Sequence, residues 1–216
     1  MANSGMTLAD MLSDYEHLWR QAQGIPGHVT KNEGLLLYLF GAQQCSEGHI
    51  VEVGSFHGRS SLVLGCGMLK QRQRNGKLVC IDNFVKQSSR SFPHAINPKQ
   101  ALLENIIKFG LTDIFYLYEA DSVEALESMK AESCGLVFID SDHNETQISQ
   151  EFPLAVRALS RRGVVLIHDY RNSSMDAAYT KWIDDQVRSR YETVFVQDST
   201  PSYGGNGLLI VKPKSP

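Results

Sequence analysis

Short apolar runs alternate with helical segments along most of this sequence, and this alternation limits the possible folds more than any other feature. Runs such as LVCI (78–81), LVFI (136–139) and VVLI (164–167) contain no polar position, as expected for strands that helices cover on both faces. Helical segments, such as 98–110 and 146–160, lie between the runs. Strands and helices in this order predict a doubly wound, mostly parallel α/β sheet.

The C-terminal end of the chain departs from this alternation. The strands predicted at 191–197 and 204–213 follow each other with no helix between them. Parallel neighbours need a crossover of roughly a dozen residues or more, so we expect the final strand to run antiparallel. The five earlier strands are expected at 49–54, 77–82, 113–120, 135–140 and 163–169. Together these elements predict a Rossmann-like seven-stranded sheet with helices on both faces.

Length and composition favour a single domain over residues 1–216. Hydrophobic residues make up 42% of the chain and charged residues 21%, which is ordinary for a globular protein. A chain of this size can bury a sizeable core. Two helical segments precede the first strand, so we expect an N-terminal helical cap at 1–46 on a Rossmann-like core at 47–216.

Charge and cysteine usage disfavour several classes of partner. The formal net charge is −3, so the chain lacks the basic footprint of a nucleic-acid-binding protein. No apolar stretch approaches the roughly 20 residues that span a bilayer, and the N-terminus shows no signal-peptide pattern. The four cysteines have neither CxxC nor zinc spacing. We therefore expect a cytoplasmic protein that binds neither nucleic acid nor membrane.

A ligand site is expected where the first strand meets its helix, in the sequence IVEVGSFHGRSS (50–61). Gly54 and Gly58 would let the backbone approach a ligand, and the following helix presents free N–H groups. Asp82 ends the next strand, where an acid can hydrogen-bond ribose hydroxyls. The alternative is that the glycines only shape the turn and that Asp82 caps a loop.

NAD(P)-dependent oxidoreductases are the main rival for such a turn. Their fingerprint is GxGxxG, whereas this turn places Phe56 and His57 where a pyrophosphate would need room. Glu52 would also repel a pyrophosphate, yet it suits a cationic ligand such as an amino group or a sulfonium. The turn therefore favours a cationic, nucleotide-like cofactor over a dinucleotide.

The sequence VEVGSFHGRSS resembles the E-x-G-x-x-x-G motif of class I S-adenosylmethionine-dependent methyltransferases. The similarity covers most of the chain, because KLVCIDNF, EADSVEAL, LVFIDSDHNET and GVVLIHDY match successive family motifs. The chain is similar to small bacterial O-methyltransferases with an IDGDHSYE-like loop, which are related to catechol-type and caffeoyl-CoA-type enzymes. This resemblance implies S-adenosylmethionine as cofactor and a hydroxyl of a small molecule (a sugar, a phenol or a natural product) as methyl acceptor.

The resemblance also implies where the cofactor binds. Glu52 and Gly54 would lie near its methionine portion, Asp82 at the ribose and Asp121 near the adenine. The full set of implied cofactor-binding residues is Glu52, Gly54, Ser55, Gly58, Asp82, Asp121, Ser122 and Asp140. Acids after strands also cap the helices that follow them, and this alternative stays open for Asp121.

Two adjacent strand ends aim acids and histidines at one place. Asp140 and His143 follow one buried strand, and His168 and Asp169 follow the next. Methyl transfer to oxygen needs an acceptor that is held in line with the S–CH3 bond and that loses its proton. In the relatives, the position three residues beyond Asp140 holds the general base, so His143 is the expected base and His168 the next candidate. The alternative is that His143 caps the helix beginning near Thr146.

A divalent ion is a further implication of the resemblance. In metal-dependent relatives an acid at the place of Asp140 and a pair after the fifth strand hold the ion, but here that pair reads His168-Asp169. We expect Asp140 and Asp169 as ligands, Asp142 or His168 as a substitute for the missing oxygen ligand, and Mg²⁺ as the ion. Without an ion, the acids would orient His143 or bind a polyol acceptor.

The acceptor pocket itself is less readable. Its walls are expected from the N-terminal helices, from a candidate lid at 85–98 and from the loop at 198–205, with aromatic and polar groups at Phe92, His94, Tyr170 and Tyr203. His28 is a lone histidine, and such residues more often lie at the surface or are satisfied in the core than act in a site. The N-terminal helices could also form a homodimer interface. A cofactor-binding interaction module without catalysis is the remaining alternative, which the intact acid and histidine loops disfavour.

Overall fold

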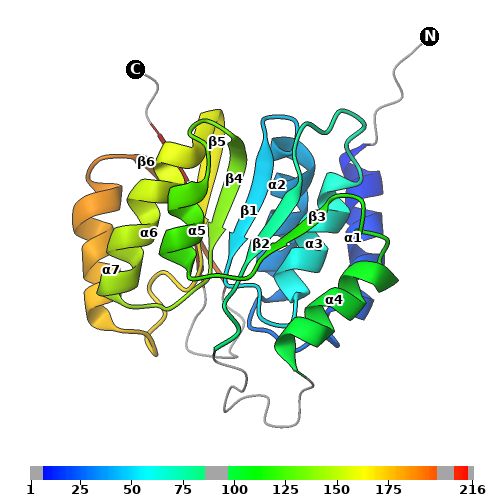
Figure 1. Ribbon diagram of the computed structural model, residues 1–216, viewed down its shortest axis with the longest axis horizontal. Coiled ribbons are helices and arrows are strands. Elements are labelled where there is room, and N and C mark those ends of the chain that lie inside the picture. The colour runs from blue at the N-terminus through cyan, green and yellow to red at the C-terminus, as the bar shows by residue number, and fades with distance from the viewer. Residues whose placement is uncertain (1–6, 86–96, 199–206, 214–216) are drawn as a thin grey trace.

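A seven-stranded sheet forms the centre of the computed structural model, which describes residues 7–85, 97–198 and 207–213. The strand order is β3-β2-β1-β4-β5-β7-β6 (Figure 1). The strands are β1 (His49–Val53), β2 (Leu78–Ile81), β3 (Phe115–Tyr118), β4 (Cys134–Ile139), β5 (Leu159–Ile167), β6 (Glu192–Gln197) and β7 (Gly207–Lys212). Strands β1 to β5 pair in parallel, while β7 runs antiparallel to both β5 and β6. The predicted sheet, including its antiparallel last strand, is confirmed.

Helices cover both faces of this sheet, as the sequence predicts. Helices α1 (Leu8–Ala22), α2 (Lys31–Gln44), α3 (Arg59–Met68) and α4 (Pro98–Lys108) lie on one face, and α5 (Ser122–Ser128), α6 (Glu145–Ala158) and α7 (Ala177–Trp182) lie on the other (Figure 1). Helix α7 continues directly into a π-helical stretch, η1 (Ile183–Arg188). The sheet is therefore the middle layer of three.

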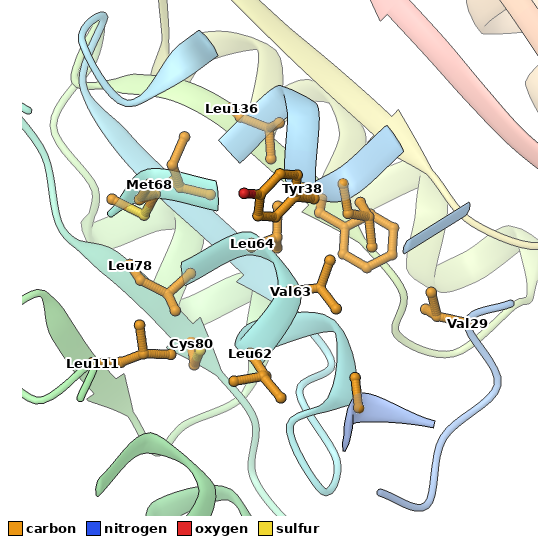
Figure 2. Packing of buried hydrophobic residues seen from close by; sticks show 14 of the residues in the cluster. Val29, Tyr38, Leu62, Val63, Leu64, Met68, Leu78, Cys80, Leu111 and Leu136 are labelled. Carbon is orange, nitrogen blue, oxygen red and sulfur yellow. The ribbon is translucent and has the colours of Figure 1, made fainter. Parts of the chain in front are cut away.

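The continuous apolar runs supply one core on each face, because successive strand residues point to opposite sides. Ile50 and its partner Leu136 pack in the core under α2 and α3, together with Tyr38 (Figure 2). Val51 and its partner Val137 belong to the core under α5, α6 and α7. Glu52 is the one polar residue within the central run of β1, and it is fully buried.

The two N-terminal helices begin at capping boxes, Thr7 with Asp10 for α1 and Thr30 with Glu33 for α2. Their buried side chains, including Tyr15, join the core of the adjacent sheet face. The division into a cap at 1–46 and a core at 47–216 stays a prediction. Within the described ranges, each helix is too short or too polar to cross a membrane.

Candidate active site

A cavity of about 920 Å³ opens at the edge of the sheet where strands β1 to β5 end. Residues directly after these strands line it, and so does the loop 26–29 before α2. The predicted site residues that line the cavity are Gly54, Ser55, Asp82, Asp121, Ser122, Asp140, His143 and Asp169. Glu52 and Gly58 are not among its lining residues. The parallel topology thus brings most of the predicted residues to one cavity.

The turn after β1 needs glycine chiefly for packing. Gly54 has a φ of +89°, and a Cβ there would lie 2.2 Å from the carbonyl oxygen of Asp140. A side chain at this position would push the ends of β1 and β4 apart. Gly58, the N-cap of α3, has a φ of +86°, and a Cβ there would lie 2.6 Å from Leu102. Both glycines therefore shape the cavity through their protein neighbours.

Asp82 lies directly after β2 and holds two loops together. Its Oδ2 accepts hydrogen bonds from the amides of Ser55 (2.9 Å) and Phe56 (2.8 Å), and its Oδ1 accepts one from the amide of Phe84 (2.7 Å). The carboxylate is thus a loop cap, one of the two possibilities that the sequence left open. It also lines the cavity, and Oδ1 keeps a lone pair for a ligand hydroxyl.

Glu52 is fully buried on the α3 side of β1. Its Oε2 accepts hydrogen bonds from the hydroxyl of Ser61 and the thiol of Cys80, whereas Oε1 has no hydrogen-bond partner among the described residues. Burial raises the pKa of Glu52 to about 7, against the opposing hydrogen bonds. Because Glu52 lies beneath the turn, it can influence a cofactor there only through the turn itself.

Behind the part of the cavity wall formed by α5 and α6 lies Glu151, a buried acid that the sequence analysis did not single out. Its carboxylate accepts hydrogen bonds from Ser122 (2.5 Å), Ser141 (2.6 Å) and Gln147 (2.9 Å). Asp121, in contrast, is exposed and caps α5 through its side chain. The capping alternative for Asp121 is therefore realised, although the residue also lines the cavity.

His143 lies in the cavity wall between two carboxylates. Its Nε2 is 3.4 Å from Asp140 Oδ1 and 3.7 Å from Asp169 Oδ2, and the side chain keeps 17% of its surface exposed. Tyr179 packs edge-on against the ring, with 5.5 Å between the ring centroids. The N-cap of α6 is Asn144, so the alternative that His143 caps this helix is wrong. The imidazole is left facing the cavity.

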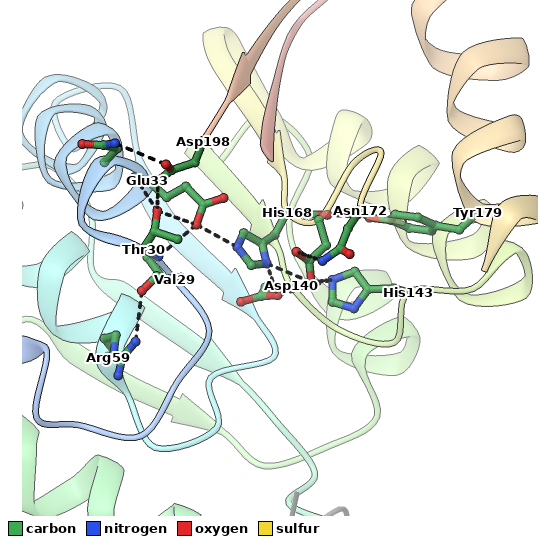
Figure 3. Close-up of polar contacts among 12 residues, drawn as sticks. Val29, Thr30, Glu33, Arg59, Asp140, His143, His168, Asn172, Tyr179 and Asp198 are labelled. Atoms are coloured by element: carbon green, nitrogen blue, oxygen red, sulfur yellow. Dashed lines mark hydrogen bonds and ion pairs between the residues drawn. The ribbon is translucent and has the colours of Figure 1, made fainter. Parts of the chain in front are cut away.

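His168 is completely buried between two carboxylates (Figure 3). Its Nδ1 lies 2.9 Å from Asp140 Oδ1, and its Nε2 lies 3.3 Å from Glu33 Oε2. Burial alone would lower the pKa of His168, but the nearby carboxylates raise it well above its ordinary value. Burial alone would likewise raise the pKa of Asp140, but the charge on His168 and contacts from His143 hold it well below its ordinary value.

Asp169 presents one carboxylate oxygen to both histidines. Its backbone lies in the left-handed region, with a φ of +55°, a conformation that costs free energy for a residue with a side chain. Asn172 donates a hydrogen bond of 2.9 Å to Oδ1, while Oδ2 lies 3.6 Å from His168 Nδ1. The strained turn after β5 therefore fixes the direction of this carboxylate.

The side chain of Arg59, at the start of α3, holds the loop before α2 against the cavity. The guanidinium donates hydrogen bonds to the carbonyls of Gln23 (3.2 Å), Ile25 (2.8 Å) and Val29 (3.0 Å). The loop held in this way places His28 in the cavity lining, although no position in the pocket was predicted for it. Burial lowers the pKa of His28, while the carboxylates at the ends of β4 and β5 oppose this effect.

The donor atoms around Asp140 match the spacing of a metal site. Asp140, His143 and His168 each offer a ligand atom within 4.8 Å of the others. Neither His143 Nε2 nor His168 Nδ1 makes a hydrogen bond of good geometry among the described residues. Mg²⁺ prefers oxygen ligands, whereas imidazole nitrogens suit ions such as Fe²⁺, Ni²⁺ or Zn²⁺. The residues fit a divalent ion, and the two imidazoles fit Mg²⁺ less well than these ions.

Three polar residues of the site, His28, Glu33 and Glu151, were not among the predicted site residues. Glu33 is the last residue of the capping box TKNE, a local signal that says nothing of its contact with His168. Glu151 lies beside Phe152 on the apolar face of α6. An acid on such a face is a signal in the sequence for a buried carboxylate with hydrogen-bond partners. Of the predicted pocket residues, Tyr170 is buried against Phe195 and does not line the cavity. Phe92, His94, Tyr203 and nearly all of 85–98 and 198–205 lie outside the described residues.

Known structures with this fold include several methyltransferases. The O-methyltransferase TomG from Streptomyces achromogenes, involved in tomaymycin synthesis and solved with S-adenosylmethionine, is similar over 97% of this chain and 92% of its own, with 16% identity and a TM-score of 0.65. An O-methyltransferase from Bacillus cereus, in complex with S-adenosylhomocysteine, is similar over 93% and 91%, with 19% identity and a TM-score of 0.63. The S-adenosylhomocysteine-bound methyltransferase PaMTH1 from Podospora anserina is similar over 94% and 88%, with 15% identity and a TM-score of 0.61.

A family described as a methyltransferase domain matches residues 51–170 of the 216. The matched segment runs from β1 through β5 and contains the turn after β1, Asp82, Asp140, His143 and Asp169. The resemblance of the sequence to the class I S-adenosylmethionine-dependent methyltransferases is thereby confirmed. Because the match spans more than half of the chain and most of its cavity-lining strand ends, the chain belongs to this methyltransferase family.

Proposed function

We propose that this chain transfers the methyl group of S-adenosylmethionine to a hydroxyl oxygen of a small acceptor (a sugar, a phenol or another natural product), with His143 as the general base. The observation that carries the proposal is the position of His143, whose Nε2 lies 3.4 Å and 3.7 Å from two carboxylates in the cavity wall. These carboxylates would stabilise the positive charge that the ring gains when it takes the acceptor's proton.

The other side chains around His143 would orient the reaction. Methyl transfer needs the acceptor oxygen in line with the S–CH3 bond. The edge-on contact with Tyr179 limits rotation of the His143 ring, and the Tyr179 hydroxyl is itself fixed by a hydrogen bond of 2.9 Å to the carbonyl of His168. The acceptor would enter beside His28 and Asn172, which line the same cavity.

The cofactor would lie across the strand ends from β2 to β4. Oδ1 of Asp82 would accept a hydrogen bond from a ribose hydroxyl, in addition to its bond from the amide of Phe84. Glu52 and Gly58 would act indirectly, by supporting the turn after β1 and the start of α3. The remaining members of the proposed contact set are Gly54, Ser55, Asp121, Ser122 and Asp140.

A divalent ion is the alternative partner for Asp140 and Asp169, in place of their direct stabilisation of the charged His143. Asp140 and Asp169 would hold it with His168 as third ligand, which leaves His143 to take the proton. A bound ion would lower the pKa of the acceptor hydroxyl. We expect a chelator to reduce methyl transfer and added Mg²⁺ or Fe²⁺ to restore it, Fe²⁺ at the lower concentration because of the imidazole ligand. Calorimetry of the apoprotein with each ion is the independent readout, and full activity in excess chelator would exclude the ion.

Thermal stabilisation separates the proposed function from its alternatives. S-adenosylhomocysteine should raise the melting temperature and NAD should not. Stabilisation by NAD alone would favour the oxidoreductase. A non-catalytic module would bind the cofactor yet yield no product when an extract of small molecules is incubated with cofactor carrying an isotopically labelled methyl group. Mass spectrometry of the labelled products would identify the acceptor.

Two features of the molecule in solution belong to the same proposal. The first is a cytoplasmic location, which follows from the reduced state expected for the four cysteines. The second is a homodimer through α1, which exposes Leu8 (62%) and Leu12 (39%). Light scattering during size-exclusion chromatography checks the dimer, and a mass near 24.1 kDa would exclude it.

A further inference from the structure

We propose that Glu151 makes the cavity wall between α5 and α6 a hydrogen-bond acceptor surface, and that this wall selects the amino group of adenine in the cofactor. The inference rests on the proposed function, since it assumes that a nucleoside cofactor occupies the cavity. It assigns a specificity-determining role to a residue that lies outside the cavity and acts through three others.

The central group is a carboxylate with no exposed surface. Glu151 is 0% exposed, and its two oxygens accept hydrogen bonds from Ser122, Ser141 and Gln147 at 2.5, 2.6 and 2.9 Å. Burial raises the pKa of Glu151, and these three hydrogen bonds oppose the rise. All three donors line the cavity, but Glu151 does not. Glu151 therefore lies behind the three side chains, and these side chains separate it from the cavity.

Every hydroxyl and amide hydrogen of these three side chains is donated in a hydrogen bond within the cluster. A serine hydroxyl has one hydrogen and a glutamine amide has two. Ser122 and Ser141 both donate theirs to Glu151, while Gln147 donates one to Glu151 and one to Ser122 Oγ (2.7 Å). The reverse orientation of the amide would place its oxygen against a carboxylate. The side chains that line this wall consequently have lone pairs, and no hydrogens, left for the cavity.

A wall whose side chains offer only acceptors favours a ligand edge that donates. The amino group of adenine is such an edge, whereas hypoxanthine presents a carbonyl oxygen at the same position. An acceptor placed against acceptors loses its hydrogen bond to water without a replacement. The wall also begins at Ser122, in the first helix after the edge strand β3, whereas Asp169 and Asn172 follow β5 nearer the middle of the sheet. The base of a nucleoside would reach this wall while its reacting group lies beside His143.

The experiment compares two ligands that differ at this position, S-adenosylhomocysteine and S-inosylhomocysteine. Isothermal titration calorimetry of the full chain should show roughly 10- to 100-fold tighter binding of the adenosyl compound, the range expected for an unpaired buried acceptor. Equal affinities would overturn the inference and leave the proposed function standing. If neither compound binds, the proposed function fails as well, so the two failures are distinguishable.

The variant Glu151→Gln tests whether the buried acid sets this preference. Its amide would donate to a serine oxygen and release that hydroxyl hydrogen to the cavity, so the affinity ratio should fall at least about tenfold. General loosening of the fold would weaken both ligands together and leave the ratio unchanged. Glu151→Asp, which keeps an acceptor, should retain the preference, and Glu145→Gln at the exposed start of α6 is the matched control. An unchanged ratio in Glu151→Gln would overturn the inference.

A second variant covers the case in which Glu151→Gln does not fold. Ser122→Ala removes one acceptor from the wall and leaves Glu151 with two donors. It should weaken the adenosyl compound more than the inosyl compound and move the ratio in the same direction. A ratio equal to that of the unmodified chain would again overturn the inference.

Discussion

The two ends of the cavity treat their polar groups differently. At the β2–β3 end (Asp82, Asp121, Ser122 and Glu151), the carboxylates accept well-formed hydrogen bonds from backbone amides or side-chain donors. At the β4–β5 end (Asp140, His143, His168 and Asp169), two imidazole nitrogens approach carboxylates at 2.9 to 3.7 Å without hydrogen-bond geometry. At the first end, the saturated end, the carboxylates are held by formed hydrogen bonds and only acceptor lone pairs remain for a ligand. At the other end, the two imidazole nitrogens lack a hydrogen-bond partner among the described residues.

This difference indicates which end binds and which end reacts. Buried polar groups are nearly always hydrogen-bonded, and exceptions mark strain, catalysis or a missing ion. Saturated groups present a fixed surface, which suits recognition of a constant cofactor. Unsaturated imidazoles beside acids suit proton transfer or ion binding, which need a group that changes partners. Substitutions at the β4–β5 end should therefore affect turnover more than cofactor affinity.

The largest expected effect concerns His143. His143→Ala should lower kcat by roughly 10²- to 10⁴-fold, the usual contribution of a general base. Cofactor affinity and melting temperature should stay close to those of the unmodified chain, because Asn144 supplies the helix cap. Steady-state methyl transfer and thermal melting measure the two quantities.

His143→Gln and the exposed-site control His17→Ala complete this test. The glutamine keeps a hydrogen-bonding side chain but cannot take the proton at neutral pH, so it should be as slow as the alanine variant. If both His143 variants turn over like the unmodified chain, the base lies elsewhere, and His168 is the next candidate.

His168 should be an exception to this contrast. It lies at the β4–β5 end and yet is completely buried, so its substitution should affect stability as well as turnover. His168→Leu leaves Asp140 and Glu33 buried without their shared partner, and we expect a loss of about 3–5 kcal/mol in the free energy of unfolding. Urea denaturation in the presence of a chelator measures it. A loss much below this range would mean that water or another cation takes the place of the imidazole.

The loss should depend on pH. Since the pKa of His168 is raised in the folded state, the stability from its charge is fully present below the unfolded pKa, about 6.5. It is lost as the pH rises through the folded value. Since the pKa of Asp140 is lowered, its contribution is present above its unfolded pKa, about 3.9, and is lost as the pH falls through the folded value. The unmodified chain should therefore exceed His168→Leu most between about pH 4 and 6.5.

The fold was predictable because its signals are local. Apolar runs such as LVFI, which serve both sheet faces, and the short link between the last two strands each determine one feature of the topology without knowledge of the rest. Most candidate site residues were predictable for the same reason. Asp82, Asp140 and Asp169 follow directly after strands, and parallel strands place their carboxyl ends at one edge.

The rest depends on contacts between distant segments. Glu33 and His168 are 135 positions apart, and no local pattern indicates that α2 places an acid against the end of β5. The burial of Glu52 was not predicted, because the sequence does not decide whether an acid within an apolar strand faces a ligand or the core. Its fixed orientation beneath α3 comes from the packing of that helix.

Glu52, buried in β1 outside both ends of the cavity, offers a further test, since its Oε1 has no hydrogen-bond partner among the described residues. The pKa of Glu52 is raised from 4.5 to about 7. Its contribution to stability is present below the unfolded pKa and is lost as the pH rises through the folded pKa. At about 1.4 kcal/mol per pKa unit, the loss across this interval is about 3 kcal/mol.

Glu52→Gln should remove this pH dependence, because the amide does not titrate. Urea denaturation at several pH values from 4.5 to 8 should show a declining free energy of unfolding for the unmodified chain relative to the variant. Parallel curves would mean that Glu52 keeps its ordinary pKa and that water reaches Oε1.

The smallest expected effect is the loss of cofactor affinity on substitution of Asp82, at the saturated end. Asp82→Ala removes the acceptor for the amides of Ser55, Phe56 and Phe84 together with the proposed acceptor for the ribose. A hydrogen bond to a charged group contributes about 1.5–3 kcal/mol, so affinity for S-adenosylmethionine in calorimetry should fall roughly 10- to 100-fold. Asp82→Asn keeps one acceptor oxygen, which can accept from the turn amides or from the ribose but not from both. Its affinity for S-adenosylmethionine should therefore lie between the affinities of the unmodified chain and of Asp82→Ala. If Asp82→Ala lowers the melting temperature and leaves affinity unchanged, the carboxylate is a loop cap alone, and the saturated end recognises the cofactor through other groups.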